Sequence, residues 1–517
     1  MAVDLAPTGL PVEEAVPAVR EALAGPGSAV LRADPGAGKT TVVPLRLLDE
    51  PWLGVQRIVV LEPRRLAARA AARRMADLLG EPVGRTVGFR TRDERKVGAA
   101  TRVEVVTEGI LTRRLQADPS LPGTGLVVFD EVHERHLQTD LALALALDAR
   151  AGLRPDLRLL AMSATLETDR LATLVDGPVI DSPGRTFSVD VRWREPVGRV
   201  PEVAVVHEAL RSDEGDVLVF LAGAGEIHRL AGALTDLPAG VDVRPLHGSL
   251  SPAEQDRALA PSPAGRRRVV LATDIAESSL TVEGVRIVVD GGRVRRPRYD
   301  ARSGLSRLQT QTASQAAAEQ RAGRAGRLGP GVAYRLWSAA EHHRRRAHPE
   351  PEIRHADLAG LALELAVWGA GAGGLPFLDP PPAQALADAR LLLTRLGALD
   401  EGGRPTAAGR AMVDLPLHPR LARMVVEDGT PTAVALAALL EERDPLRAPP
   451  DVHRADVAER LRLLAADDPR AATVRRRQRE LARRAGVGGG TVRTVDLGPV
   501  LALAHPRPRF SYFLTRC

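Results

Sequence analysis

"AVLRADPGAGKTTVVPLRLL", residues 29–48, decides the fold of this chain. Its apolar start leads into a glycine-containing turn and then into a helical pattern, which predicts a strand, a turn and a helix. Residues 33–40 fit the phosphate-loop pattern G-x-x-x-x-G-K-[ST], except that Ala33 replaces the first glycine. In this motif backbone N–H groups hold phosphates, the lysine reaches the β and γ phosphates and the hydroxyl holds Mg²⁺. Lys39 and Thr40 supply those two groups, so the stretch predicts an α/β domain that binds a nucleotide.

The composition favours a large protein with several cores and a polyanionic partner. The 517 residues are 44% hydrophobic, enough for three or four domains, and the formal net charge is +6. Of the 71 basic residues only Lys39 and Lys96 are lysines, which makes a lysine in the phosphate loop informative. The one cysteine, Cys517, excludes a disulfide framework and a zinc site built from cysteines. The acidic N-terminus and the lack of a long apolar run predict a cytoplasmic protein that does not enter the membrane.

Two further βα units follow the phosphate loop. Residues 57–74 and 101–115 each begin with a β-rich run and continue into a turn and a helical pattern. Units of this kind form a parallel sheet, whose ligands gather at the carboxyl ends of the strands. That edge would carry the polar residues of the two turns: Arg64, Arg65, Thr107 and Glu108. Other arginines of these helices, such as Arg69 and Arg73, are expected on a solvated face.

An acidic pair follows the next apolar strand. In the stretch GLVVFDEVHERH, which begins at residue 125, Asp130 and Glu131 come directly after the apolar run. Adjacent carboxylates at a strand end suit a Mg²⁺ ligand and a base that orients the attacking water in phosphoryl transfer. His133 and His136 have H-x-x-H spacing, but no third ligand for zinc is in sight.

The second half of the chain repeats the strand and helix rhythm without a phosphate loop of its own. Between residues 215 and 327 several βα units succeed one another and end in QRAGRAGR, residues 320–327. Arginine is a planar cation suited to phosphate, and glycine lets the backbone approach a ligand closely. We therefore expect two sheets that share one nucleotide, with Arg324 and Arg327 acting as arginine fingers from the second. The alternative for this stretch is a solvated basic turn.

These pieces, taken in order, resemble the motifs of the DEAH-box, superfamily 2 helicases, and most closely their bacterial HrpB-type branch. The resemblance runs from about residue 10 to about residue 505. The matching stretches are ADPGAGKT for motif I, LEPRRLAAR for Ia, TEGIL for Ib, DEVH for II, SAT at residues 163–165 for III, TDIAESSLTVEGV for V and QRAGRAGR for VI. VGFRTR at residues 87–92 and a longer stretch at 293–320, which corresponds to an inserted β-hairpin, also resemble the family.

The resemblance implies an α/β fold of tandem RecA-like P-loop domains with parallel sheets, followed by a winged-helix domain and a helical bundle. The boundaries that it predicts are 1–175 for the first RecA-like domain, 176–348 for the second with its β-hairpin, 349–425 for the winged-helix-like domain, 426–505 for a helical ratchet-like bundle and 506–517 for an atypical tail. The tail departs from the family, whose chains continue beyond this point. We therefore expect a truncated or frame-shifted reading frame, or a short variant.

The resemblance also implies a role for each residue that matches a motif. The nucleotide would be bound by Ala33, Asp34, Pro35, Gly36, Ala37, Gly38, Lys39, Thr40, Thr41 and, at its base, Arg74. The metal would be held by Thr40, Asp130 and Glu131. Hydrolysis would use Glu131, Gln320, Arg324 and Arg327. Coupling to domain movement would use His133, Ser163 and Thr165. The RNA backbone would lie near Arg64, Arg65, Thr107 and Thr273.

Three positions depart from the family pattern. Ala33 replaces a glycine that need not approach phosphate closely, so the change should be mild. Motif II reads DEVH rather than DEAH, which affects packing and not chemistry. Leu259 aligns with an aromatic residue that stacks on the base opposite Arg74, so we expect loose base selectivity.

The predicted function is that of an ATP-dependent RNA helicase, a monomer that uses ATP and Mg²⁺ and acts on single-stranded or structured RNA. Two alternatives stay open: an RNA-stimulated ATPase or remodelling protein without duplex unwinding, and a DNA-directed helicase. Phosphate contacts carry no sequence information, and a protein distinguishes RNA mainly by its 2′-hydroxyl. A P-loop metabolic kinase is excluded because it gives no role to SAT or QRAGRAGR.

Overall fold

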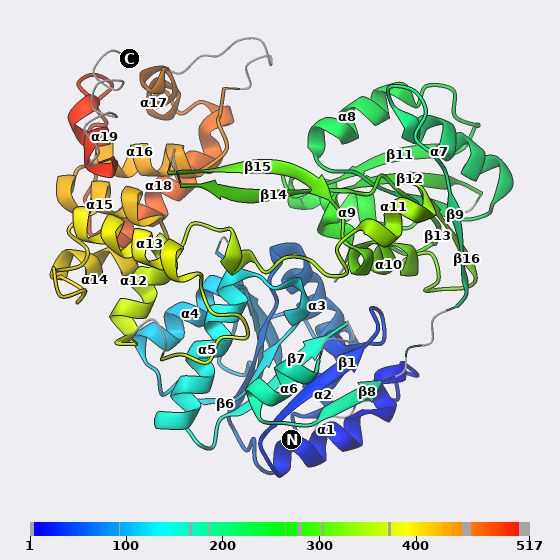
Figure 1. Cartoon of the computed structure of the whole chain (residues 1–517), viewed down its shortest axis with the longest axis horizontal. Helices are drawn as coiled ribbons and strands as arrows, with labels where there is room; N and C mark the ends of the chain where they lie inside the picture. Colours follow the sequence, from blue (N-terminus) through cyan, green and yellow to red (C-terminus); the bar gives the residue numbers. More distant parts are fainter. Residues whose placement is uncertain are drawn as a thin grey trace. The chain divides into compact units, whose positions relative to one another are not determined.

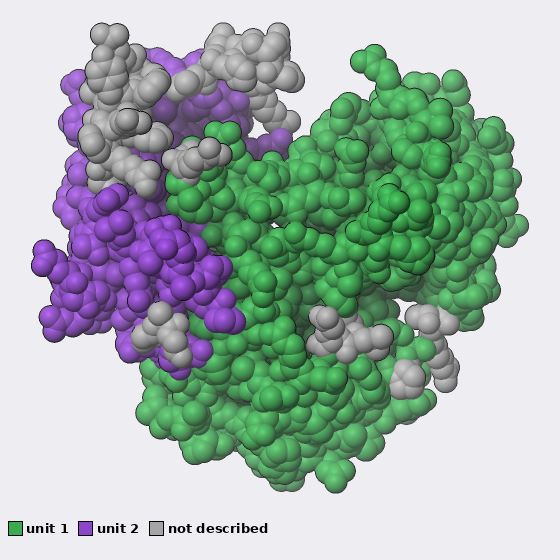
Figure 2. Space-filling model, viewed as in Figure 1, with its two compact units in different colours: residues 1–356, 376–379 green, residues 357–375, 380–517 purple. Residues whose placement is uncertain are grey.

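The computed structural model describes residues 5–92, 94–164, 168–182, 184, 187–263, 265–277, 282–301, 304–370, 374–446 and 456–505. Of the predicted features, Thr165 and the tail at 506–517 lie outside these residues. The chain divides into two compact units (Figure 2). Unit 1 comprises residues 1–356 and 376–379, and unit 2 comprises residues 357–375 and 380–517.

The first domain of unit 1 is built on an eight-stranded sheet, in the order β4-β3-β5-β2-β6-β7-β1-β8 among the described residues. All neighbouring strands are parallel except β3 and β4. The strands are β1 (Ser28–Ala33), β2 (Arg57–Leu61), β3 (Val87–Arg90), β4 (Arg95–Lys96), β5 (Val103–Val106), β6 (Thr124–Phe129), β7 (Arg158–Ser163) and β8 (Val179–Ser182). The central strands are buried along nearly their whole length, as parallel strands covered on both faces must be.

Helices cover both faces of this sheet (Figure 1). They are α1 (Val16–Ala24), α2 (Lys39–Arg46), α3 (Arg65–Leu78), α4 (Glu108–Ala117), α5 (Leu137–Gly152) and α6 (Asp169–Val175). Helices α1, α2 and α3 share one core with alternate strand residues such as Ile58 and Val60. The intervening Val59 is buried as well, so the opposite face is also covered. The phosphate loop and the acidic pair both lie at the edge where the strands end.

The second domain of unit 1 has a six-stranded, wholly parallel sheet in the order β11-β12-β10-β13-β16-β9 among the described residues. Its strands are β9 (Val189–Trp193), β10 (Asp216–Phe220), β11 (Val241–Leu246), β12 (Arg267–Ala272), β13 (Val285–Asp290) and β16 (Gly331–Arg335). Its helices are α7 (Pro201–Ser212), α8 (Ala224–Ala233), α9 (Pro252–Leu259), α10 (Gln315–Gly323) and α11 (Ala339–Arg344). The prediction of tandem α/β domains with parallel sheets is therefore confirmed.

A long β-hairpin is inserted into the second domain, within the stretch where the sequence predicts one. Strand β14 (Arg293–Asp300) pairs antiparallel with β15 (Leu305–Thr312), from Arg293 opposite Thr312 to Asp300 opposite Leu305. The hairpin extends away from the sheet of its domain (Figure 1). Directly after it, Ser314 caps the N-terminus of α10, which carries the start of QRAGRAGR.

Unit 2 is helical. Its helices are α12 (Ala359–Trp368), α13 (Ala383–Arg395), α14 (Ala407–Asp414), α15 (Pro419–Asp428), α16 (Pro431–Glu441), α17 (Val457–Ala465), α18 (Ala472–Ala485) and α19 (Gly498–Ala504). Between α13 and α14 a short antiparallel bridge joins Leu399 to Pro405, within the residues predicted as a winged-helix-like domain. Helix α16 is apolar and buried on nearly all sides, so it forms the centre of the unit. In the described part of the chain, no helix is both long and apolar enough to cross a membrane.

The two units part later in the chain than the predicted boundary between residues 348 and 349. Unit 1 continues to Ala356 because the segment before it is bonded to the first α/β domain. The Glu352 backbone N–H donates to the Arg135 carbonyl at 3.0 Å, and the Glu352 carboxylate accepts the Leu137 N–H at 2.9 Å. Asp379 pairs with Arg135 at 2.6 Å, which explains why residues 376–379 also belong to unit 1. The finer division of unit 2 at residue 425 stays a prediction.

Candidate active site

The phosphate loop has the backbone that the motif requires. Gly36 and Gly38 adopt φ of 93° and 95°, in the left-handed region that favours glycine. A Cβ at Gly38 would lie 2.9 Å from a methyl carbon of Leu10, so the chain passes closely behind the loop. Ala33, which replaces the first glycine of the motif, is buried at the end of β1. Its side chain is a methyl group, which needs no hydrogen-bond partner there. The loop is thus held in shape by its glycines and by the N-terminal segment packed against it.

The two side chains of the motif that act on phosphate and metal are paired with the acidic residues after β6. Lys39 Nζ lies 3.0 Å from Glu131 Oε1, and the two side chains are 4% and 2% exposed. The Thr40 hydroxyl donates to the Asp130 carboxylate. The other Asp130 oxygen accepts the Glu131 N–H at 2.9 Å. The sequence prediction that these four residues gather at one sheet edge agrees with their positions.

Burial and mutual repulsion dominate the charges of this acidic edge. Burial, helped by the neighbouring Glu131, raises the pKa of Asp130 to about 6 despite Lys39 and Thr40. Burial also acts to raise the pKa of Glu131, but the ammonium of Lys39 outweighs it and leaves that pKa below its ordinary value. Glu62, at the end of β2, is buried too, and burial beside Asp130 and Glu131 raises its pKa. Such a concentration of carboxylates favours a cation at this edge.

The donor set fits Mg²⁺ bound partly by a substrate. Oxygen ligands of Thr40 and Asp130 are of the type that Mg²⁺ prefers, and Mg²⁺ commonly takes one or two protein ligands together with phosphates. One carboxylate oxygen of Glu131, Oε2, is buried without a hydrogen-bond partner. Within the described residues no group of three or more His, Cys, Asp or Glu side chains is arranged to hold a metal by itself. A metal at this edge would therefore need further ligands from a bound nucleotide.

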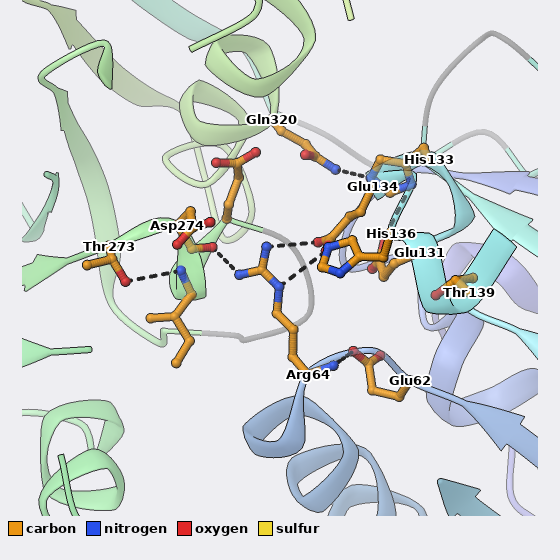
Figure 3. A network of polar contacts seen from close by, with 12 residues as sticks. Glu62, Arg64, Glu131, His133, Glu134, His136, Thr139, Thr273, Asp274 and Gln320 are labelled. Atoms are coloured by element: carbon orange, nitrogen blue, oxygen red, sulfur yellow. Dashed lines mark hydrogen bonds and ion pairs between the residues drawn. The ribbon is translucent and has the colours of Figure 1, made fainter. Parts of the chain in front are cut away.

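His133 connects the acidic edge to the second α/β domain (Figure 3). Its Nδ1 accepts the Ala164 N–H at 3.2 Å and lies 3.4 Å from Glu131 Oε2. Its Nε2 lies 2.7 Å from the side-chain amide of Gln320 on α10. Burial lowers the pKa of His133, so the ring is neutral. Because Nδ1 accepts from Ala164, the ring proton is on Nε2, and the atom of Gln320 that lies 2.7 Å from it is the amide Nε2, so a hydrogen bond here requires the amide to be turned with its oxygen toward the ring.

The three arginines of QRAGRAGR have different surroundings. Arg321 is buried and paired with Glu277 and Asp290, at 2.9 Å each, so it holds its own domain together. Arg324 Nε donates to the Glu277 carbonyl at 2.9 Å. Arg327 lies against the phosphate loop, since a Cβ at Gly36 would be 3.5 Å from its Nε. Two of the three, Arg324 and Arg327, are therefore near the edge where phosphates would bind, which excludes a solvated basic turn.

Burial depresses the basicity of both guanidinium groups near the loop. Burial lowers the pKa of Arg327 to about 10, against the attraction of Glu131. Burial, together with the charge of Arg327, lowers the pKa of Arg324 well below its ordinary value. A buried and a half-buried cation next to each other favour a polyanion between them. A nucleotide polyphosphate would supply that charge.

The residues predicted near RNA are divided between protein contacts and the surface. Arg64 is bound to Glu134 and donates to the Asp274 carbonyl of the second domain, so its guanidinium joins the two domains (Figure 3). Arg65 is exposed at the start of α3. Thr107 precedes α4, and Thr273 caps the 3-10 turn Asp274–Ala276. Their contacts with RNA stay predictions.

The two helices predicted to hold the base lie side by side. Arg73 of α3 pairs with Asp256 of α9 at 3.4 Å, so the neighbouring Arg74 and Leu259 lie on helices that meet. Arg74 is exposed, and Leu259 is half-buried against the core of the second domain. Ser163, predicted to couple hydrolysis to movement, is buried at the end of β7.

Sequence reasoning missed Glu62, Glu134 and His136. In the sequence Glu62 and Glu134 stand inside longer motif stretches that give them no role, and the spacing of His136 indicates only a zinc ligand. The structure places all three next to the predicted site, with Glu134 between Arg64 and His136 (Figure 3). The one signal for them is position: Glu62 directly follows β2, and Glu134 and His136 lie within three residues after DEVH.

Two family models match successive parts of unit 1. Residues 13–174 match the DEAD/DEAH box helicase model, and residues 201–329 match the helicase conserved C-terminal domain. These are the two α/β domains described above.

Known proteins and structures resemble the chain over much of its length. It is 45% identical over 506 residues to the ATP-dependent RNA helicase HrpB of Escherichia coli (strain K12), covering 96% of this chain and 61% of that protein. It is 37% identical over 418 residues to the probable ATP-dependent RNA helicase DHX34 of Mus musculus, covering 77% of this chain and 36% of that one. The crystal structure of Escherichia coli DEAH/RHA helicase HrpB superimposes with a TM-score of 0.87 at 45% identity, over 96% of this chain and 63% of that one.

The chain spans about three fifths of the length of HrpB. Both helicase models match in the order that the motifs predict, and the similarity to HrpB runs through unit 2 as well as unit 1. The resemblance drawn from the motifs is thereby confirmed, and the chain belongs to the DEAD/DEAH box helicases.

Proposed function

We propose that this protein is an ATP-dependent RNA helicase, which hydrolyses ATP between its two α/β domains and uses the energy to move on or unwind RNA. The observation that carries the proposal is the meeting of the two domains around one phosphate loop. Arg327 lies against Gly36, and Gln320 reaches His133 at 2.7 Å. A site made from both domains changes when they separate, which is how a motor links hydrolysis to movement. The names of HrpB and of DHX34 support RNA as the polymer.

The ion pair between Lys39 and Glu131 suggests how hydrolysis begins. Without a nucleotide, the Lys39 ammonium neutralises Glu131 at 3.0 Å and lowers its pKa. The β and γ phosphates of ATP attract Lys39 away, so Glu131 loses its counter-ion and becomes a stronger base. Its free Oε2 can then accept a proton from the water that attacks the γ phosphate. Binding of ATP thus activates the base as well as delivering the substrate.

The arginines and Gln320 act on the other side of the phosphate. Arg324 and Arg327 balance the charge that develops on the γ phosphate in the transition state. Gln320, fixed by His133, orients the water. Thr40 and Asp130 would hold Mg²⁺, which neutralises charge on the β and γ phosphates when it is bound. Each arginine comes from the second domain, so hydrolysis needs both domains in place.

RNA would contact both domains through its backbone. Arg65 is exposed, and Thr107 and Thr273 lie at the carboxyl edges of their sheets. Contacts to phosphates alone predict little sequence preference. We propose that the protein works as a monomer in the cytoplasm.

Strand displacement by the purified chain tests this proposal. We expect ATP-dependent displacement from an RNA duplex with a single-stranded extension, and none with Lys39→Ala. ATP hydrolysis that RNA stimulates without displacement would make the protein an RNA-stimulated remodelling ATPase. Displacement of a DNA duplex in preference to RNA would make it a DNA helicase. Stimulation should weaken as salt is raised, because phosphate contacts release counterions.

A further inference from the structure

A half-buried histidine joins two carboxylates beside the candidate active site. His136 Nε2 lies 2.9 Å from Glu134 Oε2, and its Nδ1 lies 3.5 Å from Glu108 Oε1. Thr139 of α5 donates to the same Glu108 oxygen at 2.6 Å. Glu108 is the first residue of α4 and directly follows Thr107, which is predicted to lie near RNA. His136 therefore ties the end of α4 to the turn that follows the acidic pair.

The second carboxylate continues the connection into the other α/β domain. Arg64 binds Glu134 with Nη2 at 3.1 Å from Oε1 and with Nε at 3.3 Å from Oε2. The same guanidinium donates to the carbonyl of Asp274 in the second domain (Figure 3). Glu134 is thus held from two sides, by Arg64 and by His136. The contacts run without a break from α4, through His136, Glu134 and Arg64, to the turn that Thr273 caps.

The turn that carries Glu134 is rigid and also holds the catalytic groups. The 3-10 turn Val132–Glu134 lies between Glu131 and Arg135, whose φ angles of 52° and 55° are in the left-handed region. Such angles are costly for residues other than glycine and persist only when contacts fix them. Glu131 is fixed by Lys39, and Arg135 is fixed by Asp140 and Asp379. A displacement of Glu134 is therefore passed to His133, which is in the same turn and touches Gln320.

The charges of this cluster depend on one another. Burial acts to lower the pKa of His136, but the hydrogen bond to Glu134 and the charge of Glu108 outweigh it and raise the pKa to about 9. Burial raises the pKa of Glu108, against the attraction of His136. The other charged groups that act on this pair are Arg64, Asp140 and Glu352. An imidazolium between two carboxylates holds both, whereas a neutral side chain leaves them to repel each other.

We propose that His136 is a positioning residue that couples the RNA-facing end of α4 to the hydrolytic turn, by clamping Glu108 and Glu134 together. The inference rests on the proposed function, because coupling requires that RNA stimulate hydrolysis. RNA bound at Thr107 moves the start of α4, the clamp moves Glu134, and the rigid turn resets His133 and Gln320 around the attacking water. His136 touches neither ATP nor the water.

ATP hydrolysis with and without single-stranded RNA tests the clamp. We expect His136→Gln to lower the ratio of the RNA-stimulated kcat to the RNA-free kcat by about tenfold, within the range over which mutations alter coupling between sites. The KM for ATP should change less than twofold. His136→Lys, which keeps a cation between the carboxylates, should restore at least a third of the wild-type ratio. His228→Gln is the matched control, because His228 is exposed on α8 and its Nδ1 bonds to the Ala224 carbonyl of its own helix.

A double-mutant cycle with Glu134→Gln separates a clamp from a general loss of structure. If His136 acts through Glu134, the double variant should have the same ratio as the worse single variant. An unchanged ratio in His136→Gln, or equal losses of the stimulated and RNA-free rates, would overturn the inference while the proposed function stands. If RNA does not stimulate the wild type, the proposed function fails and the inference fails with it.

Discussion

Gln320 of α10 and His133 of the DEVH turn meet across the two α/β domains of unit 1, with 2.7 Å between the Gln320 side-chain amide and His133 Nε2. The other ring nitrogen of His133 accepts the Ala164 N–H and lies 3.4 Å from Glu131. One neutral imidazole therefore contacts the base that we propose for hydrolysis, the end of β7 and the second domain. If the two domains lost contact, the side chain of His133 would transmit that change to Glu131.

Replacing Gln320 tests this connection. Gln320→Ala removes the side chain that meets His133 and a group that orients the water, so we expect kcat for ATP hydrolysis to fall about tenfold or more. ATP binding should be nearly unaffected, because the contact that Gln320 makes is with His133. Steady-state hydrolysis and the affinity for a fluorescent ATP analogue measure the two effects. A variant with wild-type kcat would show that His133 does not depend on Gln320.

Replacing the residues of the buried ion pair should separate binding from chemistry. Lys39→Ala removes the cation that binds the β and γ phosphates, so both ATP affinity and turnover should be lost. Glu131→Gln keeps the shape of the base but not its basicity, so ATP should still bind while kcat falls by about 10² to 10⁴. Equilibrium binding and steady-state turnover check both variants. Normal hydrolysis in either one contradicts the assignment of this site.

Arg327→Ala should lower kcat far more than the affinity for ATP. An arginine finger stabilises charge that exists only in the transition state, and its loss costs about 10³ to 10⁵ in kcat. Arg344→Ala is the matched control, since Arg344 is exposed on α11. Turnover and nucleotide affinity of the two variants provide the comparison. A large loss of affinity with unchanged kcat would make Arg327 a binding residue rather than a finger.

The His136 cluster should give the protein a distinctive dependence of stability on pH. The pKa of His136 is raised to about 9, so the stability from its two carboxylate partners is complete below about pH 6.5. That stability is lost as pH rises through the folded-state pKa, with a slope of up to about 1.4 kcal/mol per pH unit. The difference in Tm between wild type and His136→Gln should therefore be largest near pH 6.5 and shrink by pH 9.5. A difference that is constant across this range would mean that His136 is neutral in the folded protein.

A glycine in unit 2 offers a test of the packing there. A Cβ at Gly409, in α14, would lie 2.1 Å from the carbonyl oxygen of Ala398, next to the short bridge of the predicted winged-helix-like domain. Gly409→Ala should therefore destabilise the protein by about 1 to 3 kcal/mol or more. Gly360→Ala is the control, because a Cβ at Gly360, in α12, meets nothing within 4 Å. Chemical denaturation followed by circular dichroism should show loss of stability in the first variant and little change in the second.

The tandem α/β fold could be predicted because its signals are local. Apolar runs mark the strands, and the carboxyl ends of parallel strands gather at one edge whatever the loops do. For this reason Lys39 and Thr40 could be expected beside Asp130 and Glu131, although about 90 residues separate them. The β-hairpin at 293–312 followed from its resemblance to a family segment.

The partners of individual charges could not be predicted in the same way. The pattern QRAGRAGR does not reveal that Glu277 and Asp290 hold Arg321, or that Arg327 lies against the phosphate loop. Those partners come from strands and turns far along the chain, and only the assembled sheet brings them close. The same holds for His136, whose partner Glu108 lies on another helix. Unit 1 continues past the predicted boundary at residue 348 because Glu352 and Asp379 bond to the first domain, which no local pattern records.

The rate of ATP hydrolysis at saturating ATP, measured on the wild-type chain with and without single-stranded RNA, tests the central claim most directly. If the two α/β domains form one site that responds to RNA, the rate rises when RNA is added, and the rise diminishes as salt is increased. A rate that RNA leaves unchanged at every salt concentration would contradict the account, because hydrolysis would then be independent of the polymer on which the motor is proposed to act.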